Sequence, residues 1–271
     1  MTGADSAQPA ASVSDAHTPP AAHGSIVSLI ASATEIVCAL GLRDRLVGIS
    51  NECDFPEDVR GLPVCSEPRI DTEQACSTLA HKLVRVCSLT PHTLDDICGD
   101  FERVGAAAGV AERGRALASA FRQRLEALRG AVAVVPRPNV ACLEWLDPPM
   151  LAGGWMPELV RIAGGNPVLV TSPERFRTVG WQEIEAADPD VVVIMPCGYP
   201  IPRTLEELGD GRIGSPVRRL HATRAGRTFV ADGNAYFNRP GPRIADSAEI
   251  LAKLLDPDRF PHRGVGAERW P

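Results

Sequence analysis

The feature that most constrains the fold is a long helical segment in the middle of the chain, from Ala106 to Arg129. It contains no proline, and it places Leu117, Phe121 and Leu125 on one face at spacings of four residues. At about 1.5 Å per residue this helix would be roughly 35 Å long, enough to cross a whole domain. The segment therefore predicts one helix that joins two halves of the chain.

The N-terminal half alternates between short apolar strands and helices. The sequence predicts strands at about residues 26–30, 45–50, 62–67 and 82–89, and helices that begin near residues 33 and 92. Ser32 and Glu35 have the S-x-x-E spacing of a capping box, which predicts the start of the first helix. Such alternation is typical of a parallel sheet with crossover connections.

The C-terminal half repeats this alternation and completes an α/β chain. Its predicted strands lie at about residues 139–145, 191–197 and 227–231, and its predicted helices at about 156–165, 181–190, 204–208 and 243–255. The expected organisation is a disordered tail over 1–24, an N-terminal lobe over 25–104, a backbone helix over 105–131, a C-terminal lobe over 138–257 and a tail over 258–271.

Composition and charge exclude several classes of protein. The net charge of −6 argues against a surface that follows nucleic-acid phosphates, which needs clustered Lys and Arg. No apolar run approaches the roughly 18 residues of a membrane span. The first 24 residues have neither a basic region nor an apolar region of a secretory signal, so we expect a cytoplasmic protein.

The sequence also lacks the short motifs of common enzyme classes. It contains no Walker loop, no G-x-S-x-G elbow and no H-E-x-x-H, so P-loop, serine-hydrolase and zincin functions have no support. The stretch "GDGRIG" at 209–214 matches a dinucleotide fingerprint but follows a predicted helix instead of a strand, so we expect a loop. Most of the eight cysteines are expected to be reduced, small apolar residues.

Five blocks of sequence carry a resemblance to a known family. They are "SLIASATEIVCALGLRDRLVGISNECDFP", "SLTPHTLDDI", "ACLEWLDPPMLAGGWMPELVRIAGG", "AADPDVVVIMPCGY" and "DGNAYFNRPGPR". Together they are similar to the substrate-binding proteins of cobalamin and iron-siderophore importers, most of all to a branch labelled cobalamin-binding. The resemblance implies two Rossmann-like lobes with mainly parallel sheets joined by one long backbone helix, the class III periplasmic-binding-protein arrangement. It also implies a ligand held between the lobes.

The chain departs from that family at three places in its N-terminal half and its centre. Members carry His where this chain has Asn51 and Gly154. They also carry a further helix and strand where this chain has only residues 72–82. Because a parallel crossover needs at least about a dozen residues, we expect the N-terminal lobe to be one helix–strand unit short and its side of the cleft to be more open.

The candidate ligand-binding residues lie in loops that follow the predicted strands and have no evident role in the core. They are Glu52, Cys53, Asp54, Phe55, His92, Glu144, Trp145, Trp155, Cys197, Tyr199, Asn234, Tyr236, Asn238 and Arg239. Aromatic faces with a few polar groups suit a large, flat or partly apolar ligand, such as cobalamin, another corrinoid or a haem-like ring.

Three functions stay open at this point. The first is a cytoplasmic carrier or buffer for a corrinoid-like ligand, with a transporter or pathway protein as a possible partner. The second is an enzyme that uses Glu52 or Glu144 as a general acid or base. The third is a ligand-free interaction or regulatory protein.

Some candidate residues also have competing interpretations. His92 either starts a helix or faces the ligand, and Trp155 either packs in the core or lines the site. A metal site made of Glu52, Cys53, His92, Glu144 and Cys197 is conceivable but has no spacing signature.

Overall fold

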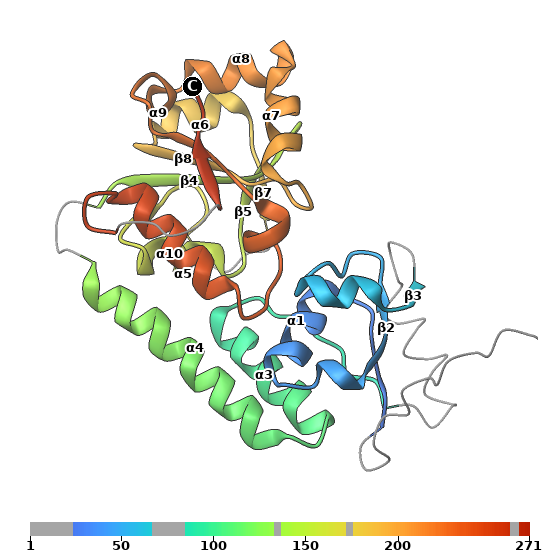
Figure 1. Ribbon diagram of the computed structural model, residues 1–271. Coiled ribbons are helices and arrows are strands. Elements are labelled where there is room, and N and C mark those ends of the chain that lie inside the picture. Colours follow the sequence, from blue (N-terminus) through green and yellow to red (C-terminus); the bar gives the residue numbers. More distant parts are fainter. Residues whose placement is uncertain (1–23, 67–84, 133–136, 172–175, 261–265) are drawn as a thin grey trace, which may run out of the picture.

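The protein consists of two α/β lobes with a long helix running along them (Figure 1). The computed structural model describes residues 24–66, 85–132, 137–171, 176–260 and 266–271. Within these residues, no helix is both long and apolar enough to cross a membrane. The predicted tail over 1–24 lies almost entirely outside the described residues.

The N-terminal lobe is built on a parallel sheet. Its described strands are β1 (Ile26–Ser28), β2 (Leu46–Ser50) and β3 (Val64–Ser66), in the order β1-β2-β3. Helix α1 (Ala31–Ala39) follows β1 and buries Ile36 and Val37 in the core. The short 3₁₀ turns η1 (Arg43–Arg45) and η2 (Glu57–Gly61) complete the connections.

Two expectations for this lobe are wrong. The strand expected over 82–89 is not formed by residues 85–89, while residues 82–84 and the short segment 72–82 lie outside the described residues. Ser32 and Glu35 do not cap α1, because the helix begins earlier, with Ile30 as its N-cap and no side-chain cap. The Glu35 side chain is directed instead at arginines of the other lobe.

Helices α3 (Leu94–Ala107) and α4 (Ala111–Ala131) form a closely packed pair that links the lobes. A Cβ on Gly114 would lie 2.6 Å from the carbonyl oxygen of Phe101, so the two backbones touch at a point where only glycine fits. The rings of Phe101 and Phe121 meet edge to face, with centroids 5.5 Å apart.

The long helix begins later than the sequence predicts. Residues 105–107 complete α3, and Gly109 adopts a left-handed φ of 80° that separates the two helices. The backbone helix is therefore α4, from Ala111 to Ala131, and Phe121 and Leu125 are buried as their spacing predicts, whereas Leu117 is only partly buried.

The C-terminal lobe contains a seven-stranded mixed sheet with a parallel centre. The strand order is β10-β9-β8-β4-β5-β7, and β6 pairs with β4. Strands β4, β8, β9 and β6 run parallel, and β5, β7 and β10 are antiparallel to their neighbours. The strands are β4 (Asn139–Leu146), β5 (Pro149–Ala152), β6 (Asn166–Pro167), β7 (Phe176–Thr178), β8 (Val191–Ile194), β9 (Thr228–Ala231) and β10 (Ala267–Arg269).

Helices cover both faces of this sheet. On one face lie α5 (Met156–Ile162) and α10 (Ile244–Leu255), with α4 packed beyond them, and on the other lie α6 (Trp181–Ala187), α7 (Ile201–Gly209), α8 (Gly211–Arg219) and α9 (His221–Arg224) (Figure 1). Side chains of β8 alternate between the two cores: Val193 joins the first and Val192 the second. This buries the central strand on both sides, as a parallel strand requires.

Two further predictions for this lobe are corrected. "GDGRIG" is not a loop: Asp210 caps α8, and its side chain accepts a hydrogen bond from the Arg212 backbone N–H. The C-terminal residues are not all a tail, because β10 adds an antiparallel strand to β9 and Trp270 is buried against the second core.

Candidate functional site

The candidate residues follow the carboxyl ends of strands in both lobes. Because β4, β8 and β9 are parallel, their ends meet at one edge of the C-terminal sheet, which is where α/β proteins hold ligands. Glu144 and Trp145 end β4, Cys197 and Tyr199 follow β8, and the five-residue π-helical turn η3 (Gly233–Phe237) follows β9. From the N-terminal lobe, residues 51–56 follow β2.

An aromatic pair lies at this edge. The rings of Trp145 and Tyr199 have centroids 5.4 Å apart at an interplanar angle of 59°. The indole N–H of Trp145 donates to the Asp147 carbonyl at 3.1 Å, and the guanidinium of Arg203 lies 5.4 Å from the Tyr199 ring centroid. Both rings are only partly buried, so the pair offers aromatic surface beyond what the fold itself uses.

The charges of two glutamates, one from each lobe, affect the pKa of the same thiol. The Cys197 backbone N–H donates to the Glu144 carbonyl at 3.0 Å, which fixes the two residues side by side. Burial raises the pKa of the Glu144 carboxyl to about 7. Burial and the nearby charges of Glu144 and Glu52 raise the pKa of the Cys197 thiol. Glu52, Glu144 and Cys197 therefore lie near one another across the lobe boundary.

The turn η3 is held rigidly against the C-terminal lobe. A Cβ on Gly233 would lie 2.2 Å from the Pro196 carbonyl oxygen, so only glycine permits this approach. The Asn238 amide donates to the Met195 carbonyl at 3.1 Å, and the Trp155 indole N–H donates to the Phe237 carbonyl at 3.2 Å. Asn238 and Trp155 thus have structural partners within their own lobe.

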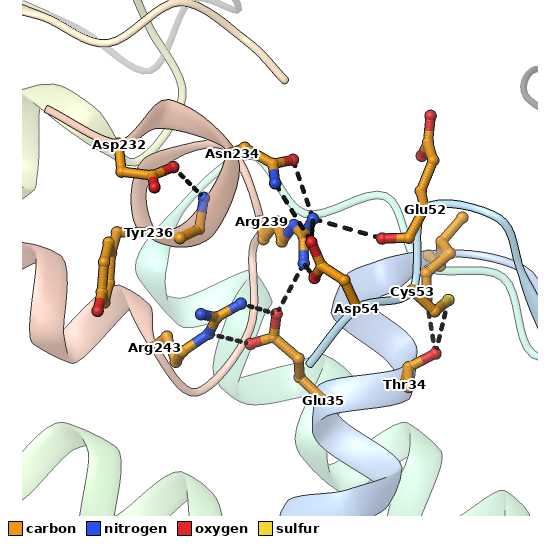
Figure 2. A network of polar contacts seen from close by, with 12 residues as sticks. Thr34, Glu35, Glu52, Cys53, Asp54, Asp232, Asn234, Tyr236, Arg239 and Arg243 are labelled. Atoms are coloured by element: carbon orange, nitrogen blue, oxygen red, sulfur yellow. Dashed lines mark hydrogen bonds and ion pairs between the residues drawn. The ribbon is translucent and has the colours of Figure 1, made fainter. Parts of the chain in front are cut away.

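A network of charged groups connects the two lobes (Figure 2). From the C-terminal lobe, Arg239 binds both carboxylate oxygens of Asp54, one of them at 3.2 Å, and lies 3.6 Å from a Glu35 oxygen. Arg243 binds the same Glu35 in bidentate fashion, at 2.9 and 2.6 Å. We call Glu35, Asp54, Arg239 and Arg243 the interlobe network.

The interlobe network is largely shielded from water. The side chains of Glu35 and Arg239 are 2% and 8% exposed, so their charges need each other as partners. Burial opposes ionisation of Asp54, but hydrogen bonds and the charge of Arg239 outweigh it and lower the pKa of this carboxyl below its usual value.

Neighbouring groups extend the interlobe network. Arg239 also donates to the Asn234 side-chain oxygen at 2.9 Å and to the Glu52 carbonyl at 3.3 Å. The guanidinium of Arg243 lies 3.9 Å from the ring centroid of Phe55 and 5.5 Å from that of Tyr236. Of the predicted ligand-binding residues, five therefore make contacts across the lobe boundary. These are Glu52, Asp54, Phe55, Asn234 and Arg239.

The remaining N-terminal candidates have separate positions. Cys53 is buried and receives a hydrogen bond from the Thr34 hydroxyl at 3.0 Å, so it anchors the loop that carries Glu52. The His92 backbone N–H donates to Asp96 at 3.0 Å beside the capping box of α3, which supports its role at a helix start. Its carbonyl lies 3.3 Å from where a Cβ on Gly154 would be, so the two lobes also meet there.

The hypothetical metal site is not assembled. Within the described parts of the chain, no three or more His, Cys, Asp or Glu side chains are grouped so that they could hold a metal ion. The Cys53 thiol is instead hydrogen-bonded to the hydroxyl groups of Thr34 and Ser50.

Glu35 and Arg243 are two residues of the interlobe network that sequence reasoning missed. The S-x-x-E pattern predicts a helix cap for Glu35 because it is local, whereas the partner Arg243 is 208 residues away along the chain. Arg243 ends the block "DGNAYFNRPGPR", and its presence there with Arg239 is the signal that could have indicated paired carboxylates elsewhere.

Comparison with known proteins finds relatives that are named as binding proteins. No family model matches it. The vitamin B12-binding protein of Photorhabdus laumondii subsp. laumondii is 24% identical over 254 residues, which cover 85% of this chain and 87% of that protein. The vitamin B12-binding protein of Vibrio cholerae is 23% identical over 254 residues, covering 85% and 88%.

Solved structures share the whole fold. A periplasmic haem-binding protein from Pseudomonas aeruginosa matches with a TM-score of 0.76 and 21% identity, over 90% of this chain and 96% of that one. The periplasmic vitamin B12-binding protein of Vibrio cholerae matches with a TM-score of 0.68 and 22% identity, over 86% and 96%. The fold is that of the class III periplasmic binding proteins, as the sequence predicts.

The same comparisons contradict the expected cytoplasmic location. The matching solved structures are periplasmic binding proteins, and they give no support to a cytoplasmic branch of this fold. The expectation depended on the N-terminal residues 1–23, which lie outside the described residues.

Proposed function

We propose that the chain, which is similar to vitamin B12-binding proteins over most of its length, is a substrate-binding protein that binds a corrinoid or a similar large cyclic metal chelate between its lobes. It would pass this ligand to a membrane transporter. The observation that carries the proposal is the Trp145–Tyr199 pair at the strand ends, where it lies beside carboxylates from both lobes.

The aromatic pair supports a ligand with a large apolar face. Two partly buried rings at an angle to each other give a surface of the kind that contacts flat or puckered macrocycles. Trp145 lies in β4, and Tyr199 lies in the turn after the adjacent strand β8, where its backbone is hydrogen-bonded to Pro196 and Asn234, so the position of the pair is fixed before any ligand arrives. Such preorganisation reduces the entropy lost on binding.

The charges around the pair favour a ligand without carboxylates. Glu52 and Glu144 both lie near Cys197, whereas Arg239 and Arg243 are occupied by Asp54 and Glu35. The two propionates of haem would meet the charge of Glu52 and the partly ionised Glu144 here, which disfavours binding. The amide side chains of a corrinoid are neutral and can donate hydrogen bonds to these carboxylates. The ligand of the vitamin B12-binding relatives therefore suits these side chains better than the ligand of the haem-binding proteins.

Calorimetric titration of the purified protein with cyanocobalamin, and separately with haem, tests this function. We expect saturable binding of one cyanocobalamin per chain and weaker binding of haem. Tyr199→Ala should weaken cobalamin binding, and Arg115→Gln, a change in an exposed ion pair on α4, serves as the matched control. Absence of binding to any corrinoid would overturn the proposal, and tight binding of haem alone would overturn the charge argument.

One observation favours a second function, an enzyme with Glu144 as its general acid or base. A carboxyl with a pKa of about 7 is matched to proton transfer at neutral pH. This function predicts that the wild-type protein converts its ligand to a product, whereas Glu144→Gln binds the ligand normally but does not convert it. Product analysis after prolonged incubation with cobalamin would detect the conversion. Recovery of the ligand unchanged from the wild-type protein would exclude it for that ligand.

A further inference from the structure

The interlobe network joins the lobes through residues that do not belong to their covalent connection. Its residues come from α1 and the loop after β2 on one side, and from the segment between η3 and α10 on the other. The covalent link is α4, which packs on α3 in one lobe and on α5 and α10 in the other. In Figure 1 the turn before α10 reaches down to α1, away from most of the length of α4.

Apart from the interlobe network, the lobes are joined by helix α4 and meet where the His92 carbonyl approaches Gly154. With these contacts alone, the lobes could tilt about the α3–α4 packing, because only local packing would resist that motion. A further attachment on the other side of the lobe boundary would prevent this tilting. The interlobe network supplies such an attachment with four charged side chains and bidentate geometry.

Burial makes this attachment costly to open. Separating the lobes would leave Glu35 and Arg239, now 2% and 8% exposed, without their partners until water replaced them. The backbone also approaches closely, since a Cβ on Gly241 would lie only 3.6 Å from a Glu35 oxygen. The Phe55 and Tyr236 rings further cover the Arg243 guanidinium.

We propose that Glu35, Asp54, Arg239 and Arg243 form a lock that holds the two lobes in one relative orientation whether or not a ligand is present. Arg239 is its central residue, because it contacts both carboxylates of the other lobe. Through its bond to the Glu52 carbonyl, the lock also positions the loop that faces Glu144 and Cys197. It is a positioning device, and it does not itself hold the ligand.

The lock can be tested by measuring the distance between the lobes in the absence of ligand. Spin-labelled amino acids would be introduced by genetic encoding at Ala39 and Ser215, which are exposed and lie in different lobes. Thiol reagents are unsuitable because Cys65, Cys87 and Cys197 are exposed. Pulsed electron resonance then gives the distance distribution in the full chain.

The wild-type protein should show one narrow distance distribution. In Arg239→Gln we expect a second, longer distance that belongs to lobes that have moved apart. Its population should rise from below roughly 10% to a majority, because the bonds that favour the closed arrangement are lost. Arg124→Gln is the matched control, because Arg124 also binds two carboxylates, Asp246 and Glu249, but these lie on α10 outside the lock. The control should keep the wild-type distribution.

A second variant covers the case in which Arg239→Gln does not fold. The double variant Glu35→Gln with Arg243→Gln removes one acid and one base together, so no buried charge is left alone, and it should also gain the longer distance. Folded variants that keep the narrow wild-type distribution would overturn the lock. Because no ligand enters this experiment, its failure would leave the proposed function standing, and failure of cobalamin binding would leave the lock standing.

Discussion

The interlobe network lies next to the strand-end group of Glu144, Trp145, Cys197 and Tyr199. The two regions differ in whether their polar groups already have partners within the protein. In the network, every charged side chain has a partner across the lobe boundary, and two of the four are almost fully buried. In the strand-end group, aromatic faces and a carboxyl are partly open, and burial raises the pKa of Glu144 to about 7 without a counter-charge. Satisfied groups stabilise a fold, whereas unsatisfied ones remain available to a ligand.

The largest expected effect is on the stability of the network side. Arg239→Ala leaves Asp54 and Glu35 without their shared cation, and we expect a loss of about 3–5 kcal/mol in the free energy of unfolding. Arg124→Ala, in a more exposed ion pair, should cost only about 0–1 kcal/mol. Urea denaturation of both variants measures the difference. Equal losses would show that the network does not differ from surface ion pairs.

The strand-end side should respond in the opposite direction. Glu144→Gln removes a carboxyl whose folded-state pKa is about 7, above its ordinary value near 4.3. In the wild-type protein, the contribution of Glu144 to stability falls as pH rises from about 4 to about 7, because this carboxyl ionises at lower pH in the unfolded chain than in the folded one. The variant should therefore be more stable at pH 8, by on the order of 2 kcal/mol, and equally stable below about pH 4. Thermal unfolding across this pH range would contradict us if the two curves stay parallel.

Ligand affinity separates the two regions next. Trp145→Ala should reduce cobalamin affinity about tenfold, since aromatic contacts contribute roughly 0.5–1.5 kcal/mol beyond the area they bury. Its effect on folding should be smaller than that of a core tryptophan, because the ring is only partly buried. Calorimetry and urea denaturation of the same sample measure both effects. A large loss of stability with unchanged affinity would place Trp145 in the core instead of the ligand site.

The smallest effect concerns the stability that Asp54 contributes to the network at low pH. Hydrogen bonds and the charge of Arg239 hold the pKa of Asp54 below its ordinary value near 3.9, so the stabilisation is present above that value and is lost as pH falls through the lower folded-state pKa. Asp54→Asn should cost about 1 kcal/mol at pH 7, given its 34% exposed side chain, and this cost should shrink as the pH falls below the ordinary pKa of an aspartate. A cost that does not change with falling pH would mean that Asp54 does not stabilise the protein through its charge.

The sequence predicts the fold better than the roles of its loops. Periodicity places the strands of the C-terminal sheet centre and the helices α5, α6, α7 and α10, because buried strands and amphipathic helices leave local patterns. It misses β10, because Ala267–Arg269 is short and polar and is a strand only through its pairing with β9. It extends the backbone helix too far, since Gly109 interrupts an otherwise helical pattern.

The candidate site shows the same limit more clearly. "DGNAYFNRPGPR" predicts a turn that faces a ligand, but in the structure its arginines are paired with Glu35 and Asp54, which are distant in sequence. Pairing of this kind leaves no periodic signal. Residue type and position after a strand indicated that Glu144 and Tyr199 lie at a site; only the three-dimensional arrangement distinguishes them from Arg239.

The affinity for cyanocobalamin tests this division of roles most directly. Titrations would compare the wild-type protein, the double variant Trp145→Ala with Tyr199→Ala, and the charge-neutral double variant Glu35→Gln with Arg243→Gln. We predict that loss of the two rings abolishes measurable binding, while the variant without the Glu35–Arg243 pair keeps binding within about tenfold of wild type, since this pair does not touch the ligand. Unchanged binding without the rings would contradict the account, as would complete loss of binding in a folded protein that lacks the Glu35–Arg243 pair.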